Sequence, residues 1–468
     1  MPLATSFLQD QDFIRACYIV AFILFIQGLR MLRTPVSARR GNLVAAVGMA
    51  IAVGATLLQP QVGDYGLIAV GVAVGTAIGV PAARSVRMTA MPQMVALFNG
   101  VGGGAVALIA WAEFRKYGGD YPLDVAIPSL FSAIIGSVSF WGSNIAFGKL
   151  QEILPGRPIQ APGQIFINFG LLAVAIVCAV LIAASSGHPS EALFIGILVS
   201  GALLGNLFVL PIGGADMPVV ISLLNAFTGL SAAAAGISLD NSALIVAGIL
   251  VGASGTILTR LMAEAMNRSI ANIFKGGFGG GGTAPTGDGE EKPVRSSSAD
   301  DVAIQLAYAE KVVIVPGYGM AVAQAQHAVR ELTKQLEKRG VEVDFAIHPV
   351  AGRMPGHMNV LLAEADVPYE QLKEMDDING EFSRTDVSLV IGANDVVNPA
   401  ARDVPDSPIY GMPVLNVDES NSIIVLKRSM NTGFAGIDNP LFYNEKTSLL
   451  FGDAKDSITK VTKELEAL

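Results

Sequence analysis

Nine separate runs of mainly apolar residues follow one another in the first 263 positions of the chain. A helix needs roughly 20 such residues to cross the ~30 Å hydrocarbon core of a bilayer, and each run approaches or exceeds that length. The pattern predicts a polytopic α-helical membrane bundle of about nine spans and excludes a single soluble enzyme. The runs lie at 13–29, 42–58, 66–83, 91–112, 124–147, 165–185, 192–210, 217–236 and 242–263.

Charged residues are unevenly divided along the chain. Of the 468 residues 51% are hydrophobic and only 15% are charged, whereas a soluble domain carries about 25%. Charged residues are sparse as far as Lys275 and common from there to the C-terminus. The chain therefore joins a lipid-embedded part to a globular part of ordinary composition. The net charge of −9 and the lack of a basic face exclude a nucleic-acid binder.

Lysine and arginine in the short connections between the runs predict the orientation in the membrane, because these residues mark cytoplasmic loops. One set of connections holds ten of them, and the alternate set holds only Arg115 and Lys116. We therefore expect the N-terminus outside and the C-terminal part in the cytosol. The ten are Arg30, Arg33, Arg39, Arg40, Arg84, Arg87, Lys149, Arg157, Arg268 and Lys275.

Cysteine and histidine are too few and too scattered to build a metal site. Cys17 and Cys178 lie inside apolar runs, and the four histidines have no metal-ligand spacing. We expect no disulfide framework and no bound metal. We also expect no cleavable signal peptide, because the first run lacks a basic segment before it and a small-residue cleavage site after it.

Ionisable side chains are nearly absent from the apolar runs, although intramembrane charge usually marks the path of a pump or transporter. Amides and hydroxyls take their place, and Asp216 lies at the cytosolic mouth of the eighth run. A buried amide can bridge two helices or can orient a file of water, and both interpretations remain open here. A row of glycines in the third run is typical of close helix packing. The polar residues are Asn99, Ser143, Asn144, Asn168, Asn225 and Thr228, and the glycines are Gly71, Gly75 and Gly79.

A glycine-rich stretch separates the two parts of the chain. It begins with Gly276-Gly-Phe-Gly-Gly-Gly-Gly and continues with Thr, Pro, Ser and charged residues. Such a composition has no apolar periodicity and is typical of a flexible tether. We expect a transmembrane domain over residues 1–270, a linker over 271–300 and a globular domain over 301–468.

The globular part begins with a nucleotide-binding pattern. The β-branched run Lys311–Pro316 predicts a strand, and Gly317-Tyr-Gly-Met-Ala-Val322 then leads into a helix that begins near Met320 and ends near Arg339. Strand, Gly-x-Gly and helix together favour a dinucleotide loop, in which the first glycine turns the chain and the second admits a pyrophosphate. An ordinary tight turn is the alternative.

Further strands and helices alternate after this loop. We expect strands at 341–347, 358–363, 387–391, 414–417 and 423–426, and helices at 369–378 and 455–465. This alternation predicts an α/β doubly wound, Rossmann-like parallel sheet, whose ligands lie at the carboxyl ends of the strands. The segments found there are His348–Gly356, Gly392–Asp395 and Lys427–Met430.

The charges at the strand ends favour NADP over NAD. An NAD site usually has a carboxylate at the end of the second strand, which hydrogen-bonds the ribose 2′-hydroxyl. This chain has Ile347-His348-Pro349 there and no acidic residue. Lys427 and Arg428, with Ser429 beside them, suit a 2′-phosphate instead, although a solvated pair of charges is the alternative. Tyr369 and Lys373 have the spacing of the catalytic pair of short-chain dehydrogenases. They lie closer to the glycine loop than in that family, so we expect them on the solvated face of a helix.

Several segments in the same order resemble the beta subunit of proton-translocating NAD(P) transhydrogenase, over essentially the whole chain. In the globular part they are Pro316–Gln326, Gly352–Val360, Gly392–Ala400 and Lys427–Met430. In the membrane part they are Ala146–Lys149, Ala215–Pro218 and Leu224–Asn225. The resemblance implies a subunit of a bacterial inner-membrane enzyme that couples hydride transfer between NADH and NADP+ to inward proton translocation.

The resemblance also implies roles for individual residues. Asn99, Ser143, Asp216 and Asn225 correspond to the proton path, and some family members carry a histidine where Leu97-Phe-Asn99 stands here. The titrating group would then come from the membrane part of an alpha-type subunit. The residues implied for NADP(H) are Gly317, Tyr318, Gly319, Met320, Ala321, Val322, Val350, Ala351, Gly352, Arg353, Met354, Pro355, Gly392, Ala393, Asn394, Asp395, Lys427, Arg428, Ser429, Met430, Asp453 and Ala454.

A single Gly-x-Gly loop implies that a partner supplies the second nucleotide site. We expect NADP(H) on this chain, NAD(H) on an alpha-type subunit, and a homodimer of the complex in the lipid bilayer. Hydride can pass directly between two nicotinamides, so no catalytic side chain is expected. Two other functions stay open: an NADP-sensing transporter or channel without redox activity, and a membrane NADP-dependent dehydrogenase that acts on a lipid or quinone.

Overall fold

The computed structural model divides the chain into two compact units, residues 1–211 with 220–258 and residues 212–219 with 259–468. We describe each by itself. The expected linker lies mainly in 271–293, outside the described residues. The structure describes residues 7–87, 90–117, 121–155, 158–185, 190–213, 216–265, 270, 294–353, 356–405, 407, 409–430 and 437–468.

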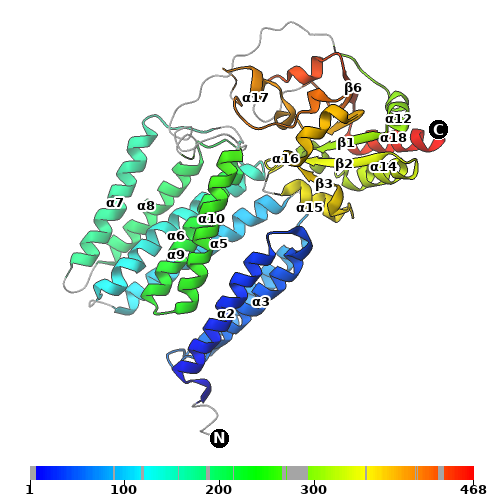
Figure 1. Ribbon diagram of the computed structural model, residues 1–468. Helices are drawn as coiled ribbons and strands as arrows, with labels where there is room; N and C mark the ends of the chain where they lie inside the picture. The colour runs from blue at the N-terminus through cyan, green and yellow to red at the C-terminus, as the bar shows by residue number, and fades with distance from the viewer. Residues whose placement is uncertain are drawn as a thin grey trace. The chain divides into compact units, whose positions relative to one another are not determined.

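Long apolar helices form at all nine of the predicted runs (Figure 1). Across the described residues, nine helices are long and apolar enough to span a bilayer, which confirms the predicted bundle. They are α2 (Gln11–Met31), α3 (Pro35–Leu57), α4 (Tyr65–Ser85), α5 (Met91–Tyr117), α6 (Leu123–Leu150), α7 (Gln164–Ala184), α8 (Glu191–Val209), α9 (Met217–Ser238) and α10 (Ser242–Ala265).

Glycines bring several of these helices into backbone contact, as small residues do where lipid gives no hydrophobic drive. A Cβ added at Gly229 of α9 would lie 2.4 Å from the backbone nitrogen of Gly252 in α10. A Cβ at Gly136 of α6 would lie 2.7 Å from the carbonyl oxygen of Gly103 in α5. These helix pairs therefore tolerate no larger residue at the contact.

The glycine row in α4 behaves differently from the prediction. Nothing lies within 4 Å of a Cβ built at Gly71, Gly75 or Gly79, and α4 buries none of its residues. The expected close helix neighbour is thus not supplied by the described part of this chain. Spacing shows what a helix face can accept, and it does not show that the same chain provides the partner.

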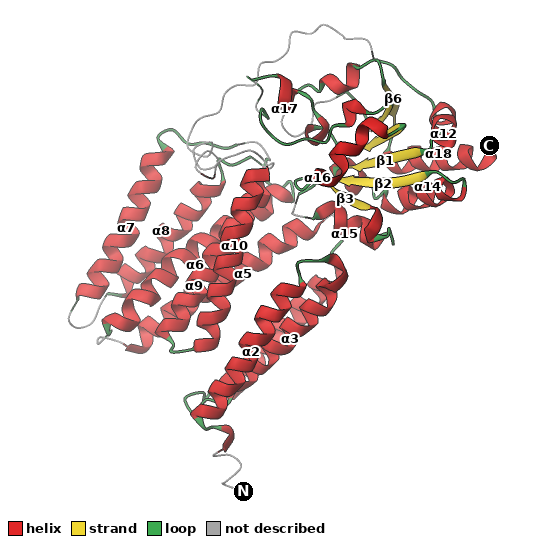
Figure 2. Cartoon of the chain, in the orientation of Figure 1, coloured by secondary structure: helices red, strands yellow, loops and turns green. Residues whose placement is uncertain are grey.

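The C-terminal unit contains six parallel strands in the order β3-β2-β1-β4-β5-β6, which confirms the doubly wound, Rossmann-like fold (Figure 2). All five neighbouring pairs are parallel. The strands are β1 (Lys311–Pro316), β2 (Glu342–Ile347), β3 (Leu372–Glu374), β4 (Val387–Ile391), β5 (Ser422–Lys427) and β6 (Thr447–Phe451).

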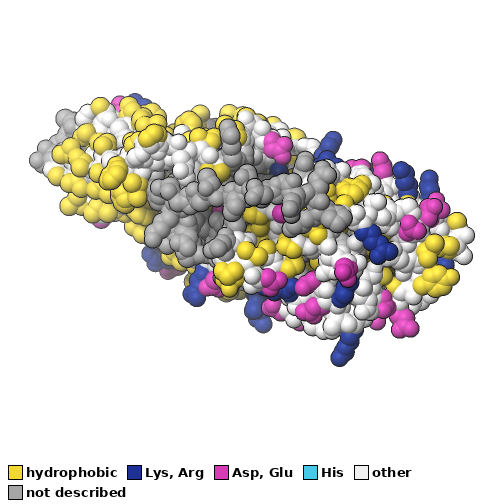
Figure 3. Space-filling model, turned by 90° about the horizontal axis from the view of Figure 1, so that it is seen from above, with side chains coloured by type: hydrophobic (Ala, Val, Ile, Leu, Met, Phe, Trp, Pro, Cys, Tyr) yellow, Lys and Arg dark blue, Asp and Glu magenta, His cyan; other side chains and the backbone are white. Residues whose placement is uncertain are grey.

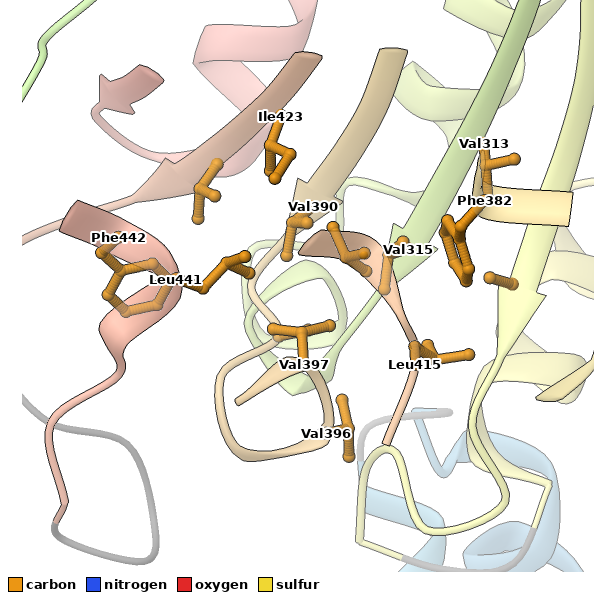
Figure 4. Close-up of a cluster of buried hydrophobic side chains, with 14 of the residues drawn as sticks. Val313, Val315, Phe382, Val390, Val396, Val397, Leu415, Ile423, Leu441 and Phe442 are labelled. Carbon is orange, nitrogen blue, oxygen red and sulfur yellow. The ribbon is translucent and has the colours of Figure 1, made fainter. Parts of the chain in front are cut away.

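Helices cover both faces of this sheet. On one face α18 packs against both α12 and α14. On the other face the strands contribute Val313, Val390 and Ile423 to a core that short helices close (Figure 4). The α-helices are α12 (Ala299–Ala307), α13 (Tyr318–Val322), α14 (Gln326–Lys338), α15 (His357–Glu364), α16 (Met375–Ile378), α17 (Ala400–Asp403) and α18 (Ala454–Ala467). The 3₁₀ helices are η3 (Tyr369–Gln371), η4 (Asn379–Arg384), η5 (Asp395–Val397), η6 (Val417–Glu419) and η7 (Pro440–Tyr443).

The structure corrects several expected elements of the C-terminal part. Residues 358–363 are helical within α15, and 369–378 divide into η3, β3 and α16. The expected strand at 414–417 is not a strand, and strand β6 was not predicted. Short apolar runs cannot be assigned to helix or strand by periodicity alone, which explains these errors.

The surface shows the difference in composition between the apolar membrane part and the charged C-terminal part (Figure 3). Hydrophobic side chains gather in one region and charged side chains in another. Membrane-helix residues such as Leu67 and Phe166 are 74% and 80% exposed, as expected of side chains that face lipid.

Candidate functional site

The strand order places a ligand crevice at the ends of β1 and β4. The chain winds outward from β1 to β2 and β3 and then returns to build β4, β5 and β6 on the other side. In such sheets the two connections leave β1 and β4 toward opposite faces, and ligands bind where they diverge. The glycine loop after β1 and the segment Gly392–Asp395 after β4 meet at this point.

Glycines join these two loops through their backbones. The N–H of Gly317 donates to the carbonyl of Ile391, and the N–H of Gly319 donates to the carbonyl of Gly392, each at 2.9 Å. A Cβ at Gly317 would lie 2.4 Å from the backbone of Ala393. Gly392 has a φ of +67°, a conformation that favours glycine. The floor of the crevice is therefore main chain, which a flat polar ligand can approach closely.

The expected long helix after the glycine loop is interrupted. The five-residue α13 ends at Val322, and α14 begins at Gln326 after Gln324, whose φ is +52°. Met320 and Ala321 are buried beneath the loop, so they support it and do not face a ligand.

A cavity of about 520 Å³ lies over this floor, at the carboxyl ends of β1, β4, β5 and β6. It brings together ten of the predicted residues, which are Gly319, Val322, Gly392, Ala393, Asn394, Lys427, Arg428, Ser429, Asp453 and Ala454. Sequence reasoning missed three lining residues, Ala323, Leu426 and Gly452. No pattern in the sequence singles them out, because they enter the cavity through the strand order.

Two cations lie on one wall of the cavity. Lys427, half-buried, places its Nζ 3.9 Å from the centroid of the Phe442 ring, and Arg428 beside it is exposed. Burial lowers the pKa of Lys427, whereas the nearby carboxylates of Asp438 and Asp395 oppose that change. The wall therefore presents concentrated positive charge within a chain whose net charge is negative.

Asp453 caps the helix that follows β6. Its carboxylate accepts from the backbone N–H groups of Lys455 and Asp456 and so caps the N-terminus of α18. The cap fixes the turn after β6, where Gly452 and Ala454 line the cavity.

The loop after β2 contributes a second group next to the glycine loop. The guanidinium of Arg353 lies 4.2 Å from the centroid of the Tyr318 ring, a cation–π contact. The backbone N–H of Arg353 donates to His357 Nδ1 at 3.0 Å. Gly352, with a φ of +104°, leaves room for that imidazole. Of the other predicted residues, Val350 and Met430 pack against the core, Ala351 is buried, and Met354 and Pro355 lie outside the described residues.

Two buried histidines hold this loop in place, a structural role that the sequence did not indicate. His348 bonds through Nε2 to the carbonyl of Pro413 at 2.8 Å and accepts from the N–H of Val350 at Nδ1. His357 accepts at Nδ1 as described. Both must therefore carry their proton on Nε2 and be neutral. Burial lowers the pKa of each from 6.5 to about 4.

We expect the C-terminal unit to lose stability as the pH falls from about 6.5 to about 4. In that window the unfolded chain binds a proton at each histidine and the folded chain does not, which destabilises the fold by up to about 3 kcal/mol per histidine. Urea midpoints of this unit, read by pulse proteolysis of the full chain, test this. His348→Asn should reduce the pH slope, whereas His327→Asn, at an exposed position on α14, should leave it unchanged. An equal slope in all three proteins contradicts the assignment.

In the membrane unit, hydrogen bonds connect polar side chains of three helices. Asn99 of α5 donates to Ser143 of α6 at 2.9 Å and to Ser139 at 3.4 Å. The Ser139 hydroxyl in turn lies 2.6 Å from that of Thr228 in α9. The structure thus brings Asn99 and Ser143 together and adds Ser139, which sequence reasoning missed because serine is common in helix contacts.

The remaining polar candidates lie apart from this chain of bonds. Asn144 donates to the carbonyl of Phe140 in its own helix, and the side chain of Asn168 is buried in α7. Asn225 is half-buried in α9, and its side chain forms no hydrogen bond with the described residues. Asp216 is buried immediately before α9 begins at Met217.

The Tyr369 and Lys373 pair is not a catalytic pair. Tyr369 begins the 3₁₀ turn η3, and Lys373 lies in strand β3 beside Ala346 of β2. The four-residue spacing therefore does not bring the two side chains onto one helix face, and the expected solvated helix at 369–378 is wrong as well.

Known proteins similar to this chain agree with the geometry. The model of the family described as NAD(P) transhydrogenase beta subunit matches residues 14–464. Two proteins named NAD(P) transhydrogenase subunit beta, both from Rhodospirillum rubrum, are each 48% identical over 459 residues. The matched segment covers 96% of this chain and 98% of each relative.

Proposed function

The chain belongs to the NAD(P) transhydrogenase beta subunit family, and we propose that it binds NADP(H) in the cavity of its C-terminal unit and carries the proton path. It is a multi-pass membrane subunit of a transhydrogenase. Residues 1–270 would form the proton-translocating domain, 271–300 the linker and 301–468 the nucleotide domain. The chain would lie in a bacterial inner membrane with its C-terminal domain in the cytosol.

One observation carries the nucleotide assignment: the cavity combines a floor of glycine backbone with Lys427 and Arg428 on one wall. Gly317 and Gly319 let the loop after β1 pack directly against the loop after β4, and the resulting main-chain surface offers the close backbone approach that a pyrophosphate needs. A 2′-phosphate needs cations where an NAD site would have a carboxylate. The residues present therefore fit NADP(H) better than NAD(H).

The residues of the cavity would bind and orient the dinucleotide. NADP(H), when bound, supplies a nicotinamide ring that can give or accept a hydride. Tyr318 belongs to the glycine loop and stacks with Arg353 from the loop after β2, and this pair would shield the nicotinamide ring from water. No side-chain acid or base is required for the transfer itself, and an alpha-type subunit would bring NAD(H).

We expect the purified chain alone to bind NADP+ but to transfer no hydride from NADH to an NADP analogue. Adding the alpha-type subunit in vesicles should restore transfer together with a pH gradient. The sequence has one Gly-x-Gly loop that follows a strand, so we expect the donor site to come from the partner. Transfer by the chain alone contradicts the proposal, reduction only with added quinone indicates a dehydrogenase, and binding without any transfer in the complex indicates a sensor or channel.

The hydrogen-bonded series Asn99, Ser143, Ser139 and Thr228 supports the proton path. These groups concentrate polarity where α5, α6 and α9 meet. Asn225 adds an amide on α9 outside the hydrogen-bonded series. Amides and hydroxyls can orient water but do not titrate, so the titrating group would come from the partner. Asp216 immediately precedes α9 and would exchange protons at the cytosolic mouth.

Asn225→Leu should abolish proton pumping and steady-state reverse transfer in reconstituted vesicles, because a leucine interrupts a water file. Transfer between nucleotides that are already bound should continue, since it needs only the two nucleotide sites. The matched control is Ser222→Ala on the same helix, which removes a real interhelical bond from Ser222 Oγ to the carbonyl of Gly255 at 3.1 Å. The control should lower heat stability and remain coupled. Normal pumping by the leucine variant refutes the role of Asn225.

A further inference from the structure

A short segment before β6 supports two walls of the cavity at once. We call residues 438–443 the bracket, and they contain the 3₁₀ helix η7. The side chain of Asn439 caps the N-terminus of η7 by accepting a hydrogen bond from the N–H of Leu441 at 3.0 Å. The same side chain donates to the carbonyl of Asn394 at 3.1 Å. Because Asn394 lines the cavity, the bracket is tied to the loop after β4.

Phe442 in the bracket cannot shift easily. Its side chain is only 2% exposed and belongs to the core that the strands form on one face of the sheet. In Figure 4 Phe442 and Leu441 extend from η7 beside the strand that carries Ile423. The position of the ring is therefore determined by packing of the whole domain.

Lys427 is held between two fixed points. Lys427 is the last residue of β5, and its backbone pairs with Phe451 of β6. At the other end of the side chain, Nζ lies 3.9 Å from the Phe442 ring centroid. A lysine side chain is otherwise among the most flexible and loses much rotamer freedom when it binds a ligand. The ring restricts that freedom before any ligand arrives.

The ring also competes with carboxylates for the ammonium group. Asp395 and Asp438 both attract Lys427. The Asp438 carboxylate accepts from the N–H of Asn439 and from the hydroxyl of Tyr443, which keeps it in the bracket. Lys427 lines the cavity, and the contact with the ring restrains its ammonium group from turning toward these carboxylates.

We propose that Phe442 is a positioning residue that sets the preference of this cavity for a 2′-phosphorylated nucleotide, by holding Lys427 Nζ at the cavity wall. The inference rests on the proposed NADP(H) function and deepens it. Phe442 touches Lys427 and is not expected to touch the nucleotide.

The test measures, on the complex of the full chain with its alpha-type subunit, the affinities for adenosine 2′,5′-bisphosphate and for 5′-AMP. These probes differ only in the 2′-phosphate, so the ratio of their dissociation constants reports the preference. Phe442→Leu should reduce the ratio about three- to tenfold. Phe442→Tyr, which keeps a ring, should retain it. In the Lys427→Ala background, Phe442→Leu should cause no further change.

A second substitution protects the test against misfolding. Phe442→pentafluorophenylalanine keeps the shape of the ring but reverses its electrostatic face, so it should preserve folding and lower the ratio. An unchanged ratio in both the leucine and the fluorinated protein overturns the inference, and so does an equal loss of both affinities. Equal affinity of the unaltered complex for the two probes would instead contradict the proposed function.

Discussion

Replacing Lys427 and Arg428 together by alanine should weaken NADP+ binding by a factor on the order of 10²–10⁴ and leave NAD+ binding within about threefold. Each cation can form charge-assisted hydrogen bonds with a 2′-phosphate, and both line the same cavity wall. NAD+ has an uncharged 2′-hydroxyl in place of that phosphate and should therefore respond little to the loss of the two cations. Titration calorimetry of the full chain with each nucleotide measures both effects.

The matched control removes the same charge elsewhere on the domain. Lys460 and Lys463 are exposed on α18, away from the cavity lining, and their double alanine variant changes the net charge equally. If that control weakened NADP+ binding as much, the effect would come from the general field of the domain. A cavity-wall variant that kept its preference for NADP+ would remove the basis of the assignment.

Gly317→Ala should destabilise the C-terminal unit by about 3 kcal/mol or more and abolish nucleotide binding. The added Cβ would lie 2.4 Å from the backbone nitrogen and Cα of Ala393, and both loops are fixed by strands at their origin. Neither loop can move away without breaking the hydrogen bonds that join them. Urea unfolding of the full chain, with nucleotide binding measured in parallel, tests this expectation.

Gly380→Ala is the control for adding a methyl group at a glycine. Nothing lies within 4 Å of a Cβ at Gly380, which is exposed in η4, and its φ is not in the left-handed region. We expect that variant to unfold at nearly the same urea concentration as the unaltered chain. Equal stability of the Gly317 variant would mean that the two loops are not locked together.

The number and order of the membrane helices were predictable because each span must bury about 20 apolar residues whatever surrounds it. Their ends were less so, since the second helix begins at Pro35 and not near 42. The eighth run, expected at 217–236, is the helix Met217–Ser238. What the sequence could not show is which helices meet. The glycine row of α4 has nothing in contact with it among the described residues, whereas the glycines of α9 and α10 touch backbone to backbone.

In the globular part, strong β-branched runs such as Lys311–Pro316 and Val387–Ile391 were predictable, because they are buried on both faces of a parallel sheet. The three-residue strand β3 was not, since its only support is pairing with Phe345–Ile347. The helix after the glycine loop was expected to be continuous, and the turn at Gln324 has no signal such as glycine or proline.

The residues of the site also fall into a group that the sequence indicates and a group that only the fold reveals. Glycines and paired cations at strand ends carry chemical signals, so Gly317, Gly392, Lys427 and Arg428 could be proposed from the sequence. The fold brings Gly392, Lys427 and Arg428 into one cavity. Phe442 could not, because it is an ordinary core residue until the fold places Lys427 over its ring. Ser139 was hidden for a similar reason, since its role depends on the neighbours Asn99 and Thr228.

The backbone floor formed by Gly317, Gly319 and Gly392 has a consequence for redesign of coenzyme choice. Contacts made by main-chain atoms cannot be altered by substituting a side chain. They should also bind the shared pyrophosphate of two dinucleotides equally well. Engineering toward a different coenzyme should therefore concentrate on the wall at 427–429 and its support at Phe442. Libraries that vary 427–429, keep an aromatic ring at the buried position 442 and retain the glycines should yield folded proteins at a high rate, whereas libraries that include the floor should mostly yield unfolded ones.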